Sequence, residues 1–165
     1  MDPITALVET EAIKRLKARY MRDVDTKEWD DLAETFAPDA RSVYSDGKFS
    51  FEGRDAIIGF LRKALGPTDI ATMHQAHTPE IEITSDTTAR GTWYFEDVVI
   101  NSTNVSDHMP AGTVLHGTGI YHDEYVKIDG EWKISLTGYE RIFEYTEPRH
   151  PDAVLVTRWS RQDGR

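Results

Sequence analysis

The sequence predicts an α+β domain in which three N-terminal helices and a cone-shaped, curved antiparallel sheet enclose an apolar pocket. Two observations carry this prediction. Helical periodicity is confined to the part of the chain before Ile70, and long strand patterns follow from there to Phe143. A run of helices followed by a run of strands is typical of the α+β class. The chain of 165 residues is long enough for one domain with a real core. We place this domain at residues 1–144 and a C-terminal tail at residues 145–165.

The first helix has the clearest pattern. Asp2 followed by Pro3 is a good helix start, because Asp can cap the first amides and Pro is favoured at the first helical position. Apolar residues then recur at spacings of three and four, whereas most basic residues are expected off that stripe. The stripe contains Ile13, Leu16, Tyr20 and Val24, and the basic residues are Lys14, Arg15, Lys17, Arg19 and Arg22. A helix from about Pro3 to Asp23 is therefore predicted, with Tyr20 pointing inward near its end.

Shorter elements come next. Asp25 and Glu28 resemble a capping box at the start of a second helix that Pro38 ends. A short hairpin turns at Asp46-Gly47, and a third helix begins at Gly53-Arg54-Asp55.

The remaining chain predicts long strands. They are expected at His74–Thr84, at Thr88–Ile100 and in two arms between Thr113 and Phe143. Asp129-Gly130 separates the two arms, and Asp-Gly between β-rich runs is a strong hairpin signal. Glycines within the arms indicate bends, so the sheet should be concave: these are Gly117, Gly119 and Gly138. The polar segment Asn101–Gly112 is expected to form a loop over the pocket mouth or at a subunit contact.

Composition excludes several functions. Lys and Arg number 19 and Asp and Glu 29, giving a net charge of −10, which argues against binding to nucleic acid or anionic membranes. The chain has no cysteine, so disulfides, zinc–thiolate sites and cysteine nucleophiles are excluded. We find neither a signal-peptide pattern nor an apolar run long enough to span a membrane, and expect a cytoplasmic location.

Several short motifs in one order resemble the SnoaL-like branch of the nuclear transport factor 2-like superfamily. They run from Tyr20-x4-Asp25 and Phe36-Ala-Pro-Asp-Ala through Glu52-Gly-Arg-Asp and His74-x3-Thr78-Pro to Gly130-x-Trp132-x-Ile134. The nearest types are scytalone dehydratase and bile-acid 7α-dehydratase. The resemblance implies a pocket between helices and sheet, and a cofactor-independent dehydratase or isomerase acting on a small hydrophobic cyclic hydroxy-ketone.

The resemblance also implies catalytic positions. His74 would be the general base and acid, Asp25 its partner, Tyr20 a hydrogen-bond donor to the carbonyl and Asp97 an assisting acid. Each has a structural alternative: His74 can be a structural histidine near a strand end, Asp25 can cap a helix, Tyr20 can pack in the core, and the strand carboxylate Asp97 can face solvent. Scytalone dehydratase has a histidine near the position of Asp97, and this chain does not. This difference weakens the match to scytalone as the substrate.

Further residues are expected to bind substrate: Tyr44, Phe60, Trp93, Phe95, His116 and Arg141. Arg141 can hold an anionic or carbonyl group, or form a surface salt bridge. A zinc site at His74 and His77 is disfavoured because strand parity separates their side chains. Two other functions stay open: a non-catalytic protein that binds small molecules or assists assembly, and a cyclase or ring-cleaving hydrolase. Since one sheet face would be exposed in a monomer, a homodimer or homotrimer is expected.

Overall fold

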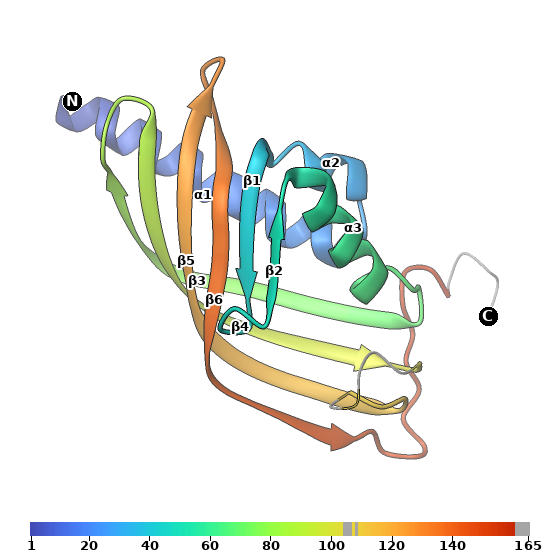
Figure 1. Cartoon of the computed structure of the whole chain (residues 1–165). Coiled ribbons are helices and arrows are strands. Elements are labelled where there is room, and N and C mark those ends of the chain that lie inside the picture. The colour runs from blue at the N-terminus through green and yellow to red at the C-terminus, as the bar shows by residue number, and fades with distance from the viewer. Residues whose placement is uncertain (104–106, 108, 161–165) are drawn as a thin grey trace.

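A computed structural model of the chain shows helices packed against a curved, open sheet (Figure 1). It describes residues 1–103, 107 and 109–160. The helices are α1 (Pro3–Thr26), α2 (Trp29–Ala33) and α3 (Arg54–Leu65). The strands are β1 (Phe36–Tyr44), β2 (Phe49–Glu52), β3 (Ile70–Ile83), β4 (Thr88–Asn101), β5 (Thr113–Ile128) and β6 (Glu131–Pro148). The α+β prediction is confirmed, although β6 extends a few residues into the segment predicted as a tail.

The six strands form one sheet in the order β2-β1-β6-β5-β4-β3. Neighbouring strands are antiparallel except β1 and β6, which are parallel. The four long strands are antiparallel as predicted, and the β1–β6 pair is a parallel addition to that sheet. β1 and β6 are far apart in sequence, and the long connection between them makes parallel pairing possible. Figure 1 shows the long strands β3–β6 curving together, with α1 lying across the sheet and α3 beside β1 and β2.

The start of α1 follows the prediction and its end does not. The Asp2 carboxylate accepts hydrogen bonds from the amides of Ile4 and Thr5, at 3.0 and 3.1 Å. The helix continues to Thr26 and ends at Lys27, which has a left-handed backbone with φ of 61°. Asp25 consequently lies in the last turn of α1. The predicted capping box was wrong, because Asp25 is inside the preceding helix and no side chain caps α2.

Pro38 also differs from the prediction, since it lies within β1 and α2 has already ended at Ala33. The register between β1 and β6 shifts between Phe36 and Arg41. A proline fits such an irregular position, because its missing amide hydrogen breaks no regular ladder bond. The predicted turn at Asp129-Gly130 is confirmed, with both residues at positive φ as a tight hairpin requires.

The core lies between the helices and the concave face of the sheet. Its fully buried side chains come from α1, α2, α3 and the inner positions of the strands, and include Ile13, Leu32, Phe36, Ile57 and Ile134. In the described part of the chain, no helix has the length and apolar character needed to cross a membrane.

Candidate active site

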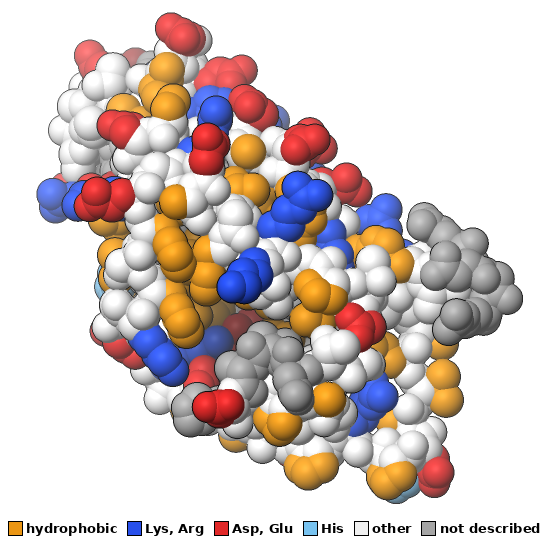
Figure 2. Space-filling view, turned by 45° about the vertical axis from the view of Figure 1, so that its right-hand side comes forward, with side chains coloured by type: hydrophobic (Ala, Val, Ile, Leu, Met, Phe, Trp, Pro, Cys, Tyr) orange, Lys and Arg blue, Asp and Glu red, His pale blue; other side chains and the backbone are white. Residues whose placement is uncertain are grey.

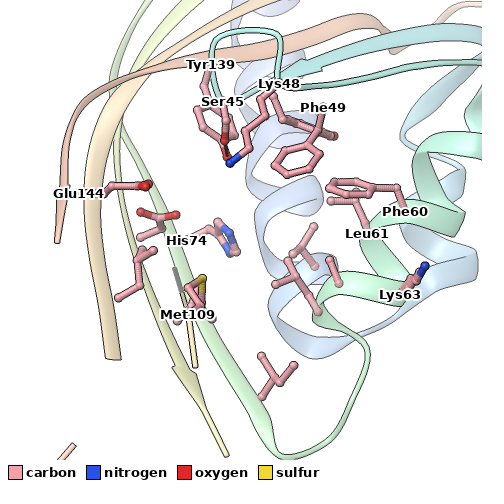
Figure 3. Close-up of a pocket in the computed structure, with 18 of the residues that line it drawn as sticks. Ser45, Lys48, Phe49, Phe60, Leu61, Lys63, His74, Met109, Tyr139 and Glu144 are labelled. Atoms are coloured by element: carbon pink, nitrogen blue, oxygen red, sulfur yellow. Dashed lines mark hydrogen bonds between the residues drawn. The ribbon is translucent and has the colours of Figure 1, made fainter. Parts of the chain in front are cut away.

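A cavity of about 810 Å³ lies between the helices and the sheet, a volume typical of small-molecule sites. Much of its wall is apolar: Val24, Phe60, Leu61, Ile70, Val99 and Leu115 contribute to it. Figure 3 shows His74 and Glu144 on one side of this space and Phe49, Phe60 and Leu61 on the other. Thr103 and Met109, in the predicted mouth loop, also line it, whereas residues 104–106 and 108 lie outside the described residues.

His74 lines this cavity and is held by Asp25. The ring Nδ1 lies 2.7 Å from Asp25 Oδ1, and the His74 backbone amide donates to Oδ2 at 2.8 Å. The Thr72 hydroxyl donates to Oδ1 at 2.7 Å. Asp25 therefore uses its carboxylate to bind β3 rather than to cap a helix. With Nδ1–H donating to Asp25, the ring Nε2 carries the lone pair of a potential base.

The environment of Asp25 favours its ionised form. Burial raises the pKa of this carboxyl group, but hydrogen bonds and the charge interaction with His74, together with the Thr72 bond, outweigh it, so the pKa is lowered. An ionised partner accepts a hydrogen bond from the imidazole and fixes its orientation. The pair therefore has the arrangement expected of a general base and its orienting carboxylate.

Four tyrosines line the same cavity: Tyr20, Tyr44, Tyr121 and Tyr139. The hydroxyls of Tyr20 and Tyr44 are 3.5 Å apart, and that of Tyr139 is 3.0 Å from Ser45 Oγ. Burial raises the pKa of Tyr20, Tyr44 and Tyr121 well above the ordinary value. These phenols stay protonated at neutral pH and are able to donate hydrogen bonds to a ligand oxygen.

Tyr20 and Tyr44 were predicted as site residues from the sequence, but Tyr121 and Tyr139 were not. The inward direction of Tyr121 and Tyr139 follows from the alternation of side chains along β5 and β6. Tyr121 pairs with Tyr139 across β5 and β6, and both side chains lie on the concave face.

Asp97 and Arg141 also meet in the cavity. Arg141 donates from Nη1 and Nη2 to the two Asp97 oxygens, at 2.6 and 2.8 Å. Its Nε lies 3.0 Å from Glu144 Oε2 without the direction of a hydrogen bond. Burial lowers the pKa of Arg141, but the Asp97 hydrogen bonds outweigh it and keep the guanidinium charged. Only 14% of the Arg141 side chain is exposed, so this is not a surface salt bridge.

A glycine makes this pair possible. A Cβ at Gly117 would lie 2.5 Å from Asp97 Oδ1 and would also overlap the Arg141 guanidinium. Because Gly117 on β5 has no side chain, Asp97 of β4 and Arg141 of β6 have room to contact each other.

Three residues expected to bind substrate lie outside the cavity lining. Phe95 is buried in the core, with its ring centroid 4.6 Å from that of Tyr121. Trp93 is buried too, and its indole donates to the Tyr125 hydroxyl at 2.8 Å. His116 stacks on Tyr145, 5.1 Å between centroids, and its Nε2 lies 3.8 Å from Glu147. His116 alternates with the inward-facing Leu115 and Gly117, which directs it to the outer face.

A buried ion pair, which the sequence did not predict, lies next to Tyr121. Lys17 Nζ lies 2.7 Å from Asp123 Oδ2, and both side chains are 0% exposed. Asp123 also accepts hydrogen bonds from the hydroxyls of Tyr125 and Thr137, each at 2.8 Å. The Lys17 ammonium is 3.5 Å from the centroid of the Tyr121 ring. The expectation that Lys17 lies off the buried stripe was wrong, because Asp123 provides it with a buried partner.

The chain matches a known domain family and is similar to several solved structures. The family model of the SnoaL-like domain matches residues 5–138. A protein from Novosphingobium aromaticivorans, provisionally named a scytalone dehydratase, is 25% identical over 93% of this chain and 95% of its own, with a TM-score of 0.76. Hexachlorocyclohexane dehydrochlorinase LinA type 3 from Novosphingobium barchaimii is 18% identical, covering 94% and 99% with a TM-score of 0.73. A Mycobacterium tuberculosis protein of unknown function is 21% identical, covering 86% and 76% with a TM-score of 0.65.

Proposed function

The chain belongs to the SnoaL-like domain family, and on that premise we propose that it is a cofactor-independent dehydratase acting on a small hydrophobic cyclic hydroxy-ketone. The observation that carries the proposal is the 2.7 Å contact between Asp25 Oδ1 and His74 Nδ1, which orients the His74 ring in the cavity lining. Relatives of similar fold that are named for eliminations, a dehydratase and a dehydrochlorinase, agree with a lyase reaction.

The reaction begins with removal of a proton next to the ketone. His74 Nε2 takes the proton from the α-carbon, and the C–H electrons form an enolate. Asp25 stabilises the imidazolium that results, as an ionised carboxylate beside it should. Tyr20 and Tyr44 donate to the oxygen on which negative charge develops, and buried donors of this kind stabilise an enolate strongly.

The second half expels the hydroxyl group from the β-carbon. The enolate electrons form the carbon–carbon double bond, the C–O bond breaks, and His74 returns its proton to the departing oxygen. The products are an unsaturated ketone and water, and His74 is neutral again. Asp97 assists indirectly: it holds the Arg141 guanidinium in the cavity, where the remaining N–H groups can bind the leaving hydroxyl.

The experiment is a comparison of His74→Ala with wild type on a panel of cyclic β-hydroxy-ketones, measured by absorbance of the conjugated product. Loss of the general acid–base contribution should lower kcat by roughly 10²- to 10⁴-fold, with less change in substrate binding. His77→Ala is the matched control, because this histidine of β3 is 44% exposed and does not line the cavity. Near-wild-type turnover of His74→Ala would refute the assignment. Tight binding without turnover by wild type would favour the non-catalytic alternative.

A further inference from the structure

Two lysines line the mouth of the cavity and have no acidic partner in the described part of the chain. Lys48 lies in the turn between β1 and β2, and Lys63 in the last turn of α3. Neither forms an ion pair with a described residue, although the chain has ten more acidic than basic residues. Figure 2 shows acidic (red) and basic (blue) side chains mixed over one face of the molecule. The Lys48 ammonium lies 5.5 Å from the Phe49 ring centroid. Figure 3 shows the Lys48 nitrogen over the cavity, on the side of Ser45 and Tyr139.

The turn that carries Lys48 is strained and fixed to the sheet. Ser45, Asp46 and Gly47 all have positive φ, at 51°, 56° and 84°. Two successive non-glycine residues in the left-handed backbone region are uncommon, and such strain persists only when surrounding contacts enforce it. Here the Asp46 amide donates to the Tyr139 carbonyl at 3.2 Å, and Ser45 Oγ contacts the Tyr139 hydroxyl at 3.0 Å. These contacts with β6 hold Lys48 at the mouth.

The other charges around the cavity leave these lysines available. Within the cavity, Asp97 neutralises Arg141, and the ring of the cavity-lining His74 is bound to Asp25. Glu144 is turned to the Arg141 Nε, at 3.0 Å. Asp46 and Glu144 are further acidic groups of the cavity lining, and neither forms an ion pair with Lys48 or Lys63. Lys48 and Lys63 are therefore basic side chains of the cavity lining that have no carboxylate partner among the described residues, whereas Arg141 is paired with Asp97.

We propose that the substrate carries an anionic group, which remains at the mouth against Lys48 and Lys63 while its hydrophobic ring reaches His74. The placement of the hydrophobic ring next to His74 rests on the proposed function, whereas the preference for an anionic ligand does not. Partly exposed ion pairs contribute modestly, so we expect each lysine to improve anion binding by about two- to five-fold. The preference should weaken with salt, since charges a Debye length apart are screened.

The test compares 1-naphthaleneacetate with its neutral analogue 1-naphthaleneacetamide by isothermal titration calorimetry. The carboxylate should bind the wild-type protein several-fold more tightly at about 0.02 M salt and nearly equally at about 0.5 M. Lys48→Met should reduce this ratio, and the Lys48→Met/Lys63→Met variant should abolish it. Lys14→Met is the matched control, because this exposed lysine of α1 does not line the cavity. A 1-naphthyl phosphate arm shows whether a carboxylate or a phosphate is preferred.

The proposal would be overturned if the carboxylate and the amide bound equally well, or if the ratio of their affinities were unchanged in the double variant. Failure of both compounds to bind would also overturn it. Lys48 and Lys63 are exposed, so these variants should fold, which circular dichroism checks. The result is separable from the proposed function. His74→Ala should keep the preference for the carboxylate while it loses turnover, whereas Lys48→Met should keep kcat and raise KM only for anionic substrates.

Discussion

Replacing Asp123 by Asn should strongly destabilise the fold, because it leaves the Lys17 ammonium without its counter-charge. The Asp123 carboxylate accepts hydrogen bonds from Lys17, Tyr125 and Thr137, and the Lys17 side chain is wholly buried. Burial already lowers the pKa of Lys17, and the Asp123 charge opposes that effect. Breaking a buried pair typically costs about 3–5 kcal/mol of unfolding free energy. This is a large share of the ~5–15 kcal/mol of a typical domain.

Urea unfolding followed by tryptophan fluorescence measures this loss. For a slope of about 2 kcal/mol per molar urea, the midpoint should fall by roughly 2 M. Asp55→Asn is the control, because this carboxylate of α3 is fully exposed and should leave the midpoint almost unchanged. Lys17→Met/Asp123→Asn should recover part of the loss, since it removes the stranded charge. A loss below about 1 kcal/mol for Asp123→Asn, the value of an exposed pair, would refute the reasoning.

Two further predictions concern the cavity walls. The pKa of Asp25 is lowered in the fold, so its contact with His74 should stabilise the protein above the unfolded pKa of about 3.9 and cease to do so as pH falls through the lower folded value. Thermal unfolding across this acid range should show a steeper pH dependence in wild type than in Asp25→Asn, in which the lowered pKa values of Asp2 and Glu9 still contribute; identical profiles would contradict it. Gly117→Ala should displace the Arg141 guanidinium and cost about 1–3 kcal/mol in chemical denaturation, whereas Gly59→Ala, which meets no neighbouring atom, should not destabilise the helix. Unchanged stability and ligand binding in Gly117→Ala would show that the space at this glycine is not required.

Local sequence could predict the elements of this fold but not the role of Asp25. Both Asp25 and Glu28 fit a helix start by type and spacing, and a capping box is a purely local pattern. Asp25 lies inside α1 rather than at the start of α2 because α1 extends to Thr26 and ends at the left-handed Lys27. That extension is supported by contacts between the end of α1 and β3, including those of Asp25 with Thr72 and His74. Such contacts join segments that are distant in sequence, so only the resemblance to a family indicated them.

Lys17 shows a second limit of sequence reasoning. It is four residues after Ile13 and three before Tyr20, so helical spacing places it on the buried stripe. Its charge argued for the opposite face, because an unpaired lysine is almost never buried. The partner, Asp123, alternates with Tyr121 and Tyr125 along the inner face of β5, which was a signal that a carboxylate is buried there. Combining the two positions would have predicted the pair, but neither pattern alone identifies its partner.

The arrangement of charge constrains what the cavity can hold. Asp25, Asp97 and Asp123 each have a basic side chain within 2.7 Å, so none of these carboxylates offers a free charge to a ligand. A charged group of a ligand would lose its hydration at depth without finding an unpaired opposite charge among the described residues, which is costly. A neutral ring whose oxygen meets the protonated phenols has no such cost. We therefore expect the reacting end of the substrate to be uncharged and any charge it carries to stay at the mouth.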